Sequence, residues 1–189
     1  MKEKNIDVLK ILIEKSGERI NIRQLSEELK MNYKNVYNIV KRLENAGLLS
    51  LERFGKAIGC TLNEKVHPLI FQAEYERREM LLKNKSFKVL YNRLKVINGQ
   101  FILILFGSYV KKTAAKRSDI DLLLITDNPK EVQNEIELLP LNIHLTHVNY
   151  KDFMTMLKSK EQTVVSEAVK KNIILFGIED YYRLIENAK

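Results

Sequence analysis

The sequence predicts an α/β (α+β) protein, made of a helical N-terminal domain with a β-hairpin and a small mixed-sheet domain with flanking helices. Between residues 4 and 45, apolar side chains recur at the spacing of amphipathic helices. From residue 101 onward, short apolar runs typical of strands alternate with helical segments. The 189 residues, of which 45% are hydrophobic and 30% charged, suffice for one large or two small globular domains.

Charge and cysteine content narrow the class of protein. The formal net charge of +8 indicates polyanionic partners, although a solvated basic surface would give the same balance. Cys60 has no second cysteine for a disulfide and lies in an apolar context, so we expect it to pack in a core. Because the sequence lacks an apolar run of about 20 residues and a signal-peptide core, we expect a cytoplasmic protein without membrane contact.

The first domain is predicted over residues 1–66. Helices are expected over 4–15, 23–30 and 33–45, an extended piece over 20–22, and hairpin strands over 48–53 and 57–62. Three helices followed by a hairpin is the element order of a winged helix. Residues 21–51 resemble the winged helix-turn-helix domains of bacterial and archaeal regulators, notably in Gln24-Leu-Ser-Glu-Glu-Leu and Val40-Lys-Arg-Leu-Glu-Asn-Ala-Gly-Leu-Leu.

DNA is the partner that this resemblance implies. Lysines contact phosphates, and asparagine and tyrosine reach base edges in the major groove. The predicted DNA-binding residues are Tyr33, Lys34, Asn35, Tyr37, Asn38 and Lys41 on the third helix, and Arg53 and Lys56 on the wing. The alternative is a winged helix that docks on protein or dimerises, with a polar face that is merely solvated.

Residues 67–85 are predicted to form a connecting helix, and residues 86–189 the second domain. The charge-dense helix over 69–83 is expected to join the domains or to form a homodimer. In the second domain, a helix over 86–97 precedes a strand over 101–106, a turn, a helix, and a strand over 118–126. Beyond these we expect helices over 128–138, 150–159, 162–171 and 178–187, and strands over 141–148 and 173–176.

The turn between the first two strands has the residues of a phosphate site. Gly107 lets a ligand approach the main chain, and Ser108 is expected to cap the helix after it, whose free amides attract phosphate. Asp119 and Asp121 share one face of the next strand, because side chains alternate along a strand. Two carboxylates on one face are suited to hold Mg²⁺ against the phosphates of a nucleoside triphosphate such as ATP.

Gly107-Ser108, ten further residues and Asp119-Ile120-Asp121 resemble the signature of minimal nucleotidyltransferases of the DNA polymerase β-like superfamily. The resemblance implies Mg²⁺-dependent transfer of a nucleoside monophosphate to an acceptor hydroxyl. It assigns Asp119 and Asp121 to metal and catalysis. The predicted nucleotide-binding residues are Gly107, Ser108, Lys112 and Ser118. Relatives include partners of HEPN-domain proteins in toxin–antitoxin pairs, so a protein acceptor is among the expectations.

Two departures from the family pattern leave the activity open. Active relatives carry a third carboxylate on the following strand, where this chain has Asn142, His144 and Thr146 on one face. His144 suits a general base but is a poor Mg²⁺ ligand. Glu135 or Glu137 would substitute only if the strand began earlier, and Pro140 argues against that.

The second departure is Lys112, which stands where many relatives have glycine. With Lys111, Lys116 and Arg117 it forms a basic rim that either attracts phosphate or faces solvent. The alternative to transfer is therefore a DNA-binding transcriptional regulator whose second domain senses nucleotide or dimerises without catalysis.

Overall fold

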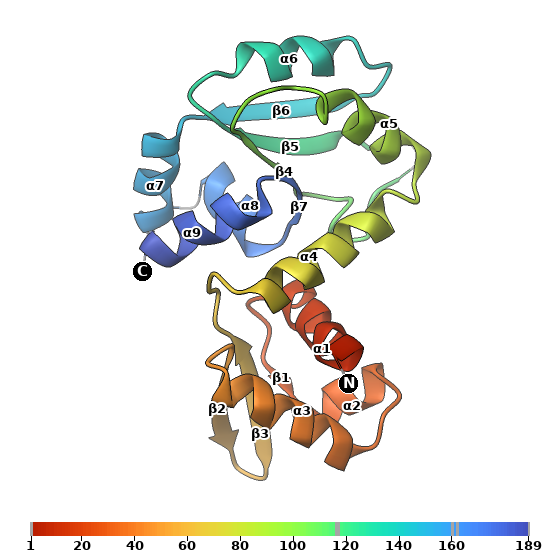
Figure 1. Ribbon diagram of the computed structural model, residues 1–189, viewed down its shortest axis with the longest axis vertical. Coiled ribbons are helices and arrows are strands. Elements are labelled where there is room, and N and C mark those ends of the chain that lie inside the picture. The colour runs from red at the N-terminus through yellow and green to blue at the C-terminus, as the bar shows by residue number, and fades with distance from the viewer. Residues whose placement is uncertain (1, 116–117, 160, 162, 189) are drawn as a thin grey trace. The chain divides into compact units, whose positions relative to one another are not determined.

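The computed structural model describes residues 2–115, 118–159, 161 and 163–188 (Figure 1). The chain divides into two compact units, Met1–Ala73 and Glu74–Lys189. Helices and two small sheets make up a mixed α+β protein, as the sequence predicted. None of the described helices combines the length and apolar character that crossing a membrane requires.

The first unit contains helices and a three-stranded sheet in the predicted order. Its elements are α1 (Lys2–Glu14), β1 (Ile20–Asn21), α2 (Ile22–Glu28), α3 (Tyr33–Asn45), β2 (Leu49–Phe54) and β3 (Ala57–Leu62). The sheet is antiparallel, with strand order β1-β3-β2. Cys60 of β3 is buried, as predicted, and burial raises the pKa of its thiol to about 11.

Asparagine caps set where α2 and α3 begin. The side chain of Asn21 accepts a hydrogen bond from the Gln24 amide, and the Gln24 side chain accepts one from the Asn21 amide, each at 2.9 Å. Asn32 caps α3 by accepting from the Asn35 amide at 2.8 Å. Such caps satisfy amides that have no partner within the helix. The apolar side of α3 is buried in the first unit through Val36, Ile39, Val40 and Leu43.

Helix α4 (Pro68–Leu81) contains the boundary between the units. The sequence assigned residues 67–85 to a separate connecting helix, whereas the structure divides the chain within α4, between Ala73 and Glu74. The part that belongs to the second unit carries Glu74 and Arg77, which are only 1% and 4% exposed and form an ion pair at 2.5 Å. A buried ion pair of this kind needs further polar partners, since charges are costly to remove from water.

Those partners come from the end of the second unit. Arg77 donates to the carbonyl oxygen of Asn172 at 2.6 Å, and the hydroxyl of Tyr182 donates to Glu74 at 2.8 Å. The Asn172 side chain in turn donates to the carbonyl oxygen of Ala168 at 2.7 Å. The C-terminal part of α4 is thereby built into the second unit.

The second unit is a four-stranded mixed sheet with helices. Its further elements are α5 (Lys85–Leu94), β4 (Ile102–Leu105), β5 (Ile120–Ile125), α6 (Lys130–Glu137), β6 (Ile143–Val148), α7 (Tyr150–Lys158), α8 (Val164–Lys170), β7 (Ile173–Phe176) and α9 (Ile178–Ala188). The strand order is β6-β5-β4-β7; β5 and β6 are parallel, and the other neighbours are antiparallel.

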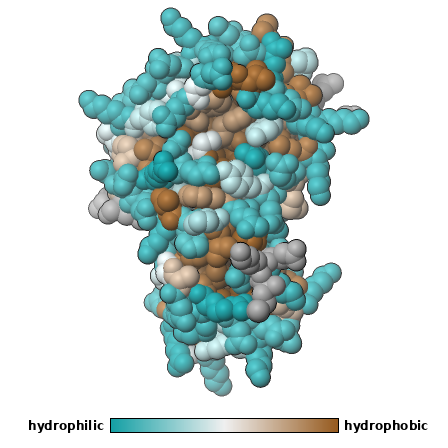
Figure 2. Space-filling model, viewed as in Figure 1, coloured by the Kyte–Doolittle hydropathy of each residue, from teal (hydrophilic) through white to brown (hydrophobic). Residues whose placement is uncertain are grey.

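Helices cover both faces of this sheet. On one face α5 and α6 bury Phe87, Leu90, Leu94, Val132 and Ile136 against Leu103, Leu105, Leu122 and Leu124 of the strands. Helices α7, α8 and α9 lie together away from α5 and α6, and α9 contacts β4 (Figure 1). The central strands are therefore buried on both faces and read as nearly continuous apolar runs. Hydrophilic side chains cover most of the surface seen in Figure 2, with apolar side chains in separate patches.

The prediction of a helix after Gly107-Ser108 is wrong. The chain forms a short turn there. The Lys111 amide donates to the carbonyl oxygen of Gly107, and the Thr113 amide donates to the carbonyl oxygen of Ser108. Lys112 has a φ of +59°, a left-handed conformation that a helix cannot contain. The chain therefore does not continue into a helix, and Ser108 does not act as a helix cap.

Candidate functional site

The turn at the end of β4 brings Gly107 against Asp121 of β5. Gly107 has a φ of +73°, and a Cβ added there would lie only 2.1 Å from Oδ2 of Asp121. The amide of Phe106 also donates to the carbonyl oxygen of Asp121 at 3.0 Å. The carboxylate thus occupies the space that a side chain at position 107 would fill, and only glycine permits this approach.

Asp119 and Asp121 form the acidic part of the site. Asp121 is the second residue of β5 and its side chain is 26% exposed, while Asp119 lies one residue before the strand and is exposed. Their spacing of two residues places them on the same face. The sequence prediction that these two carboxylates lie on one face is therefore consistent with the strand bounds.

Two side chains of the neighbouring region face these carboxylates. Asp121 is in register with His144 in the parallel pair β5–β6, and Nδ1 of His144 lies 3.5 Å from Oδ1 of Asp121. Asn142, just before β6, donates its side-chain amide to Oδ1 of Asp119. The structure thus assembles Asp119, Asp121, Asn142 and His144. The sequence placed Asn142 and His144 on one face, but the contact of Asn142 with Asp119 depends on a register that the sequence does not reveal.

No further carboxylate of the described residues completes this cluster. Glu135 and Glu137 both lie in α6, and Glu135 pairs with Arg93 of α5. Neither is on β6, so the substitution considered from the sequence does not occur. In the part of the chain that the structure describes, no group of three or more histidine, cysteine, aspartate or glutamate side chains is placed to hold a metal ion.

The other predicted nucleotide-binding residues lie on the loop between β4 and β5. The Ser118 hydroxyl accepts from the Ala115 amide at 2.8 Å, and the Tyr109 hydroxyl donates to the Ser118 carbonyl oxygen at 3.3 Å. Both contacts hold the loop. Lys112 is exposed beside Lys111, whose ammonium group pairs with Glu167 at 2.7 Å. The remaining members of the predicted basic rim, Lys116 and Arg117, lie outside the described residues.

Aromatic side chains near the turn pack inward. Phe106 is 5% exposed, and Tyr109 meets Phe87 edge to face with ring centroids 5.3 Å apart. Core packing is therefore the role of Phe106, as the sequence favoured, and Tyr109 shares that role through its ring.

The acidic pair fits one Mg²⁺ bound together with phosphates. Magnesium is usually held by one or two carboxylates, with phosphate oxygens and water completing its octahedron. The Asp121 carboxylate is held beside the turn at Gly107 by the close approach described above. Asp119, Asp121 and the substrate phosphates would supply the oxygen ligands, while His144 is the wrong donor type for this ion.

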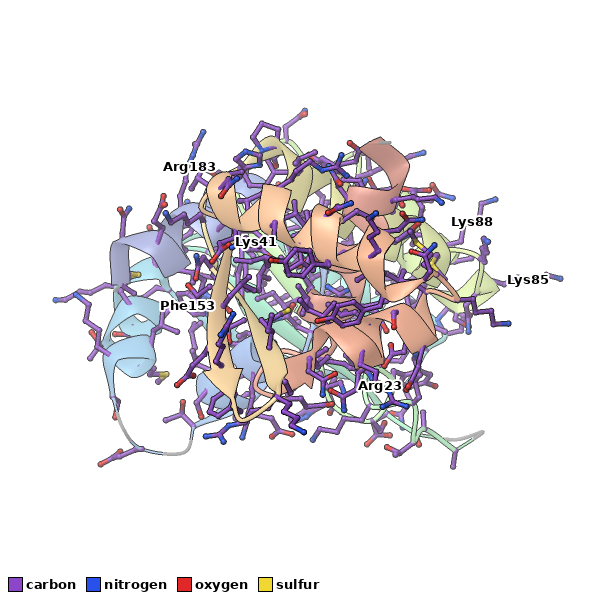
Figure 3. The ribbon with its side chains drawn as sticks, turned by 90° about the horizontal axis from the view of Figure 1, so that it is seen from below. Arg23, Lys41, Lys85, Lys88, Phe153 and Arg183 are labelled. Atoms are coloured by element: carbon purple, nitrogen blue, oxygen red, sulfur yellow. The ribbon has the colours of Figure 1, made fainter. Side chains whose placement is uncertain are left out.

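The first unit presents a polar face on α3 and the β2–β3 hairpin. Of the predicted DNA-binding residues, Tyr33, Lys34, Asn35, Asn38, Arg53 and Lys56 are exposed, and Tyr37 and Lys41 are partly exposed. Lys41 pairs with Glu44 and lies between α3 and the hairpin (Figure 3), where it lines a groove of about 200 Å³ with Tyr37 and Arg53. The hydrogen bond to Glu44 raises the pKa of Lys41, so this lysine stays charged.

A second groove, of about 330 Å³, lies on the other side of α3. Asn35, Asn38 and Arg42 line it together with Lys4 and Met31. Arg42 was not among the residues predicted from the sequence, although its spacing of four residues from Asn38 places it on the same side of the helix.

Comparisons with known proteins agree with the division into two units. Residues 88–181 match the family model described as Polymerase beta, Nucleotidyltransferase, and the match spans all the second-unit residues named above as site candidates. The second unit therefore carries a nucleotidyltransferase domain of the polymerase β type. Residues 1–63 match a second family model, described as HVO_A0114, a description that states no activity. Neither the curated proteins nor the solved structures gave a match to this chain.

Proposed function

We propose that the second unit binds a magnesium–nucleoside triphosphate and transfers the nucleoside monophosphate to an acceptor hydroxyl. The observation that carries this proposal is the approach of Asp121 to Gly107, with Asp119 two residues away, inside a segment that matches a nucleotidyltransferase family. The two carboxylates supply oxygen ligands for the cation of a bound triphosphate, and the turn at Gly107 lies directly beside Asp121.

In the proposed reaction, the acceptor oxygen forms a bond to the α-phosphorus and the bond from that phosphorus to pyrophosphate breaks. The proton of the acceptor passes to solvent or to the exposed imidazole of His144. Asp119 and Asp121 would hold magnesium, which would neutralise charge on the phosphates. Gly107 and Ser108 line the place of the outer phosphates, and Asn142 holds the Asp119 carboxylate in position.

Calorimetric titration with the four nucleoside triphosphates, with and without Mg²⁺, tests nucleotide binding directly. We expect magnesium-dependent binding to the wild-type chain and its loss in Asp119→Asn/Asp121→Asn. Asp7→Asn is the control, because this partly exposed carboxylate of the first unit pairs with Lys10 of the same helix, at 2.8 Å. A folded wild-type chain that binds none of the triphosphates would exclude the proposed activity.

A second candidate function is a regulator that binds nucleotide or dimerises without transfer. It is favoured by Asn142 and His144, which occupy the positions facing the two aspartates where a third acid would be expected. Release of labelled pyrophosphate in the presence of acceptor candidates distinguishes the two functions. The acceptors to test include protein hydroxyls, among them those of HEPN-type partners that the sequence resemblance implies.

For the first unit we propose a winged helix that binds DNA. Support comes from the order of its helices and strands, from the exposed polar side of α3, and from Arg53 and Lys56 on the hairpin. Lysines on such a surface neutralise phosphates and release counterions, so binding weakens as the salt concentration rises. A homodimer would present two such surfaces, and light scattering of the purified chain measures whether it forms.

The DNA proposal is tested with Lys34→Ala/Lys41→Ala in a binding assay at several salt concentrations. We expect weaker binding and a salt slope reduced by about 2, close to one for each phosphate that the lysines no longer neutralise. Lys85→Ala/Lys88→Ala removes the same charge from α5, where both side chains project outward (Figure 3), and serves as the control. Equal effects of the two double variants would indicate a general charge effect and contradict a specific role of α3.

A further inference from the structure

We propose that the Asp119–Asp121 site accepts one divalent cation with its triphosphate, and that His144 is the residue that excludes a second. This inference rests on the proposed nucleotide site and states how many cations that site holds. It concerns residues of β6 that face the acidic pair, and it can be measured without knowing the acceptor.

The register of β5 and β6 places His144 where a further metal ligand would stand. Asp121 pairs with His144 in the parallel ladder, and side chains at paired positions of parallel strands point to the same side. The distance of 3.5 Å between Nδ1 of His144 and Oδ1 of Asp121 agrees with this geometry. A carboxylate at position 144 would face Asp121 directly and could share a cation with it, but an imidazole stands there instead.

The donor atoms of the site suit a single cation. Magnesium takes oxygen ligands in a strict octahedron, and an imidazole does not replace a carboxylate in that set. Two cations close together also need enough negative charge to offset their repulsion. Beyond the charge of the triphosphate, Asp119 and Asp121 contribute two negative charges, and His144 contributes no negative charge.

Asn142 further reduces the number of oxygens that the acidic pair offers to metal. Its side-chain amide donates to Oδ1 of Asp119 and therefore occupies one of the positions on which a cation would otherwise bind. Asn142 acts as a positioning residue for Asp119.

Two other acids in the described part of the second unit are paired with basic side chains elsewhere. Glu135 pairs with Arg93, and Glu167 pairs with Lys111 at 2.7 Å. Across the described residues, no cluster of three metal-binding side chains is present. The protein ligands for a second cation are therefore missing from this part of the chain.

Counting bound Mn²⁺ tests the inference. Electron paramagnetic resonance measures free and bound Mn²⁺ during titration of the full chain with the α,β-methylene analogues of the four triphosphates, which resist transfer. We expect one Mn²⁺ per chain for the wild type with the analogue that binds. We expect two for His144→Asp, because an aspartate at this exposed position faces Asp121, and one for the uncharged control His144→Asn.

The possible counts separate this inference from the function on which it rests. Two Mn²⁺ bound to the wild type would overturn the inference and leave the nucleotide site intact. A His144→Asp chain that keeps native circular dichroism and still binds one Mn²⁺ would also overturn it, because position 144 would then not set the number. No Mn²⁺ with any analogue would reject the proposed nucleotide site itself.

Discussion

At the scale of single residues, the candidate site depends on the missing side chain of Gly107. The Asp121 carboxylate fills the space in which a Cβ would lie, and the φ of +73° is left-handed. An alanine here therefore meets two separate penalties, one from the backbone and one from the collision with Asp121.

Gly107→Ala is expected to destabilise the chain by more than the roughly 1–2 kcal/mol that a left-handed conformation costs a residue with a Cβ. It should also abolish nucleotide binding, because Asp121 must move. Gly17→Ala is the matched control, since Gly17 has a φ of +83° and open space around it. Urea unfolding and calorimetry measure both effects; equal losses of stability in the two variants would show that Asp121 adjusts without cost.

Lys112 also has a left-handed backbone conformation, which lowers the stability of the chain. Its φ of +59° is one that glycine adopts without strain. Lys112→Gly is expected to raise the free energy of unfolding by about 1 kcal/mol, measured by urea unfolding. Lys112→Ala shortens the side chain but keeps the strain, and should bring no such gain. A loss of stability in the glycine variant would show that contacts of the Lys112 side chain outweigh the backbone strain.

At the scale of elements, the two members of a buried ion pair on α4 are hydrogen-bonded to the end of the second unit. Arg77→Met leaves the Glu74 carboxylate buried without its counter-charge, and such a change typically costs about 3–5 kcal/mol. Adding Glu74→Leu removes the stranded charge, so we expect the double variant to recover part of this loss. Urea unfolding of both single variants and of the double variant measures the interaction free energy between Glu74 and Arg77. Strictly additive losses of stability would contradict such an interaction.

The same helix makes stability depend on pH in the alkaline range. The hydroxyl of Tyr75 donates to Glu179, and this hydrogen bond, followed by burial, raises the pKa of Tyr75 to about 12 from its ordinary 10.0. The folded state thus favours the neutral phenol. The resulting stabilisation is fully present below pH 10 and is lost as the pH rises to about 12.

Tyr75→Phe cannot ionise at this position, and its stability should fall less steeply over that interval than the stability of the wild type. Urea unfolding at several pH values measures the free energy of unfolding of both chains. The contributions of the other tyrosines and of the lysines cancel in the difference between the two chains. Parallel curves for the two chains would show that the bond between Tyr75 and Glu179 does not form in solution.

At the scale of the whole molecule, the second unit is expected to need the C-terminal part of α4. A chain of residues 67–189 keeps Glu74 and Arg77. A chain of residues 86–189, which is the second domain predicted from the sequence, lacks them. The shorter chain leaves the Tyr182 hydroxyl and the Asn172 carbonyl without their buried partners. At about 1 kcal/mol or more for each group, we expect a melting temperature lower by roughly 10 °C. Equal melting temperatures would make residues 86–189 a sufficient domain.

Most helices and strands were predictable from the sequence because their local signals agree with their packing. Helix α3 was predicted with its observed bounds, since its apolar stripe and the glycine after it are both local features. Strand β7 was also predicted with its observed bounds. The prediction of a helix after Ser108 was wrong. The spacing of the residues there is compatible with a helix, but the sequence does not show that Lys112 adopts a left-handed conformation.

Apart from the helix expected after Ser108, the sequence alone determined the order of elements. It also determined the acidic pair and the absence of a third acid on β6, because these follow from residue type and from alternation along a strand. Only the tertiary structure decided which side chains meet: Asp121 with Gly107, Asn142 with Asp119, and His144 with Asp121. Those contacts depend on strand order and register, which are selected by burial of apolar residues far apart in the chain. For the same reason the packing of Glu74 and Arg77 against the end of the second unit could not be read from α4 itself.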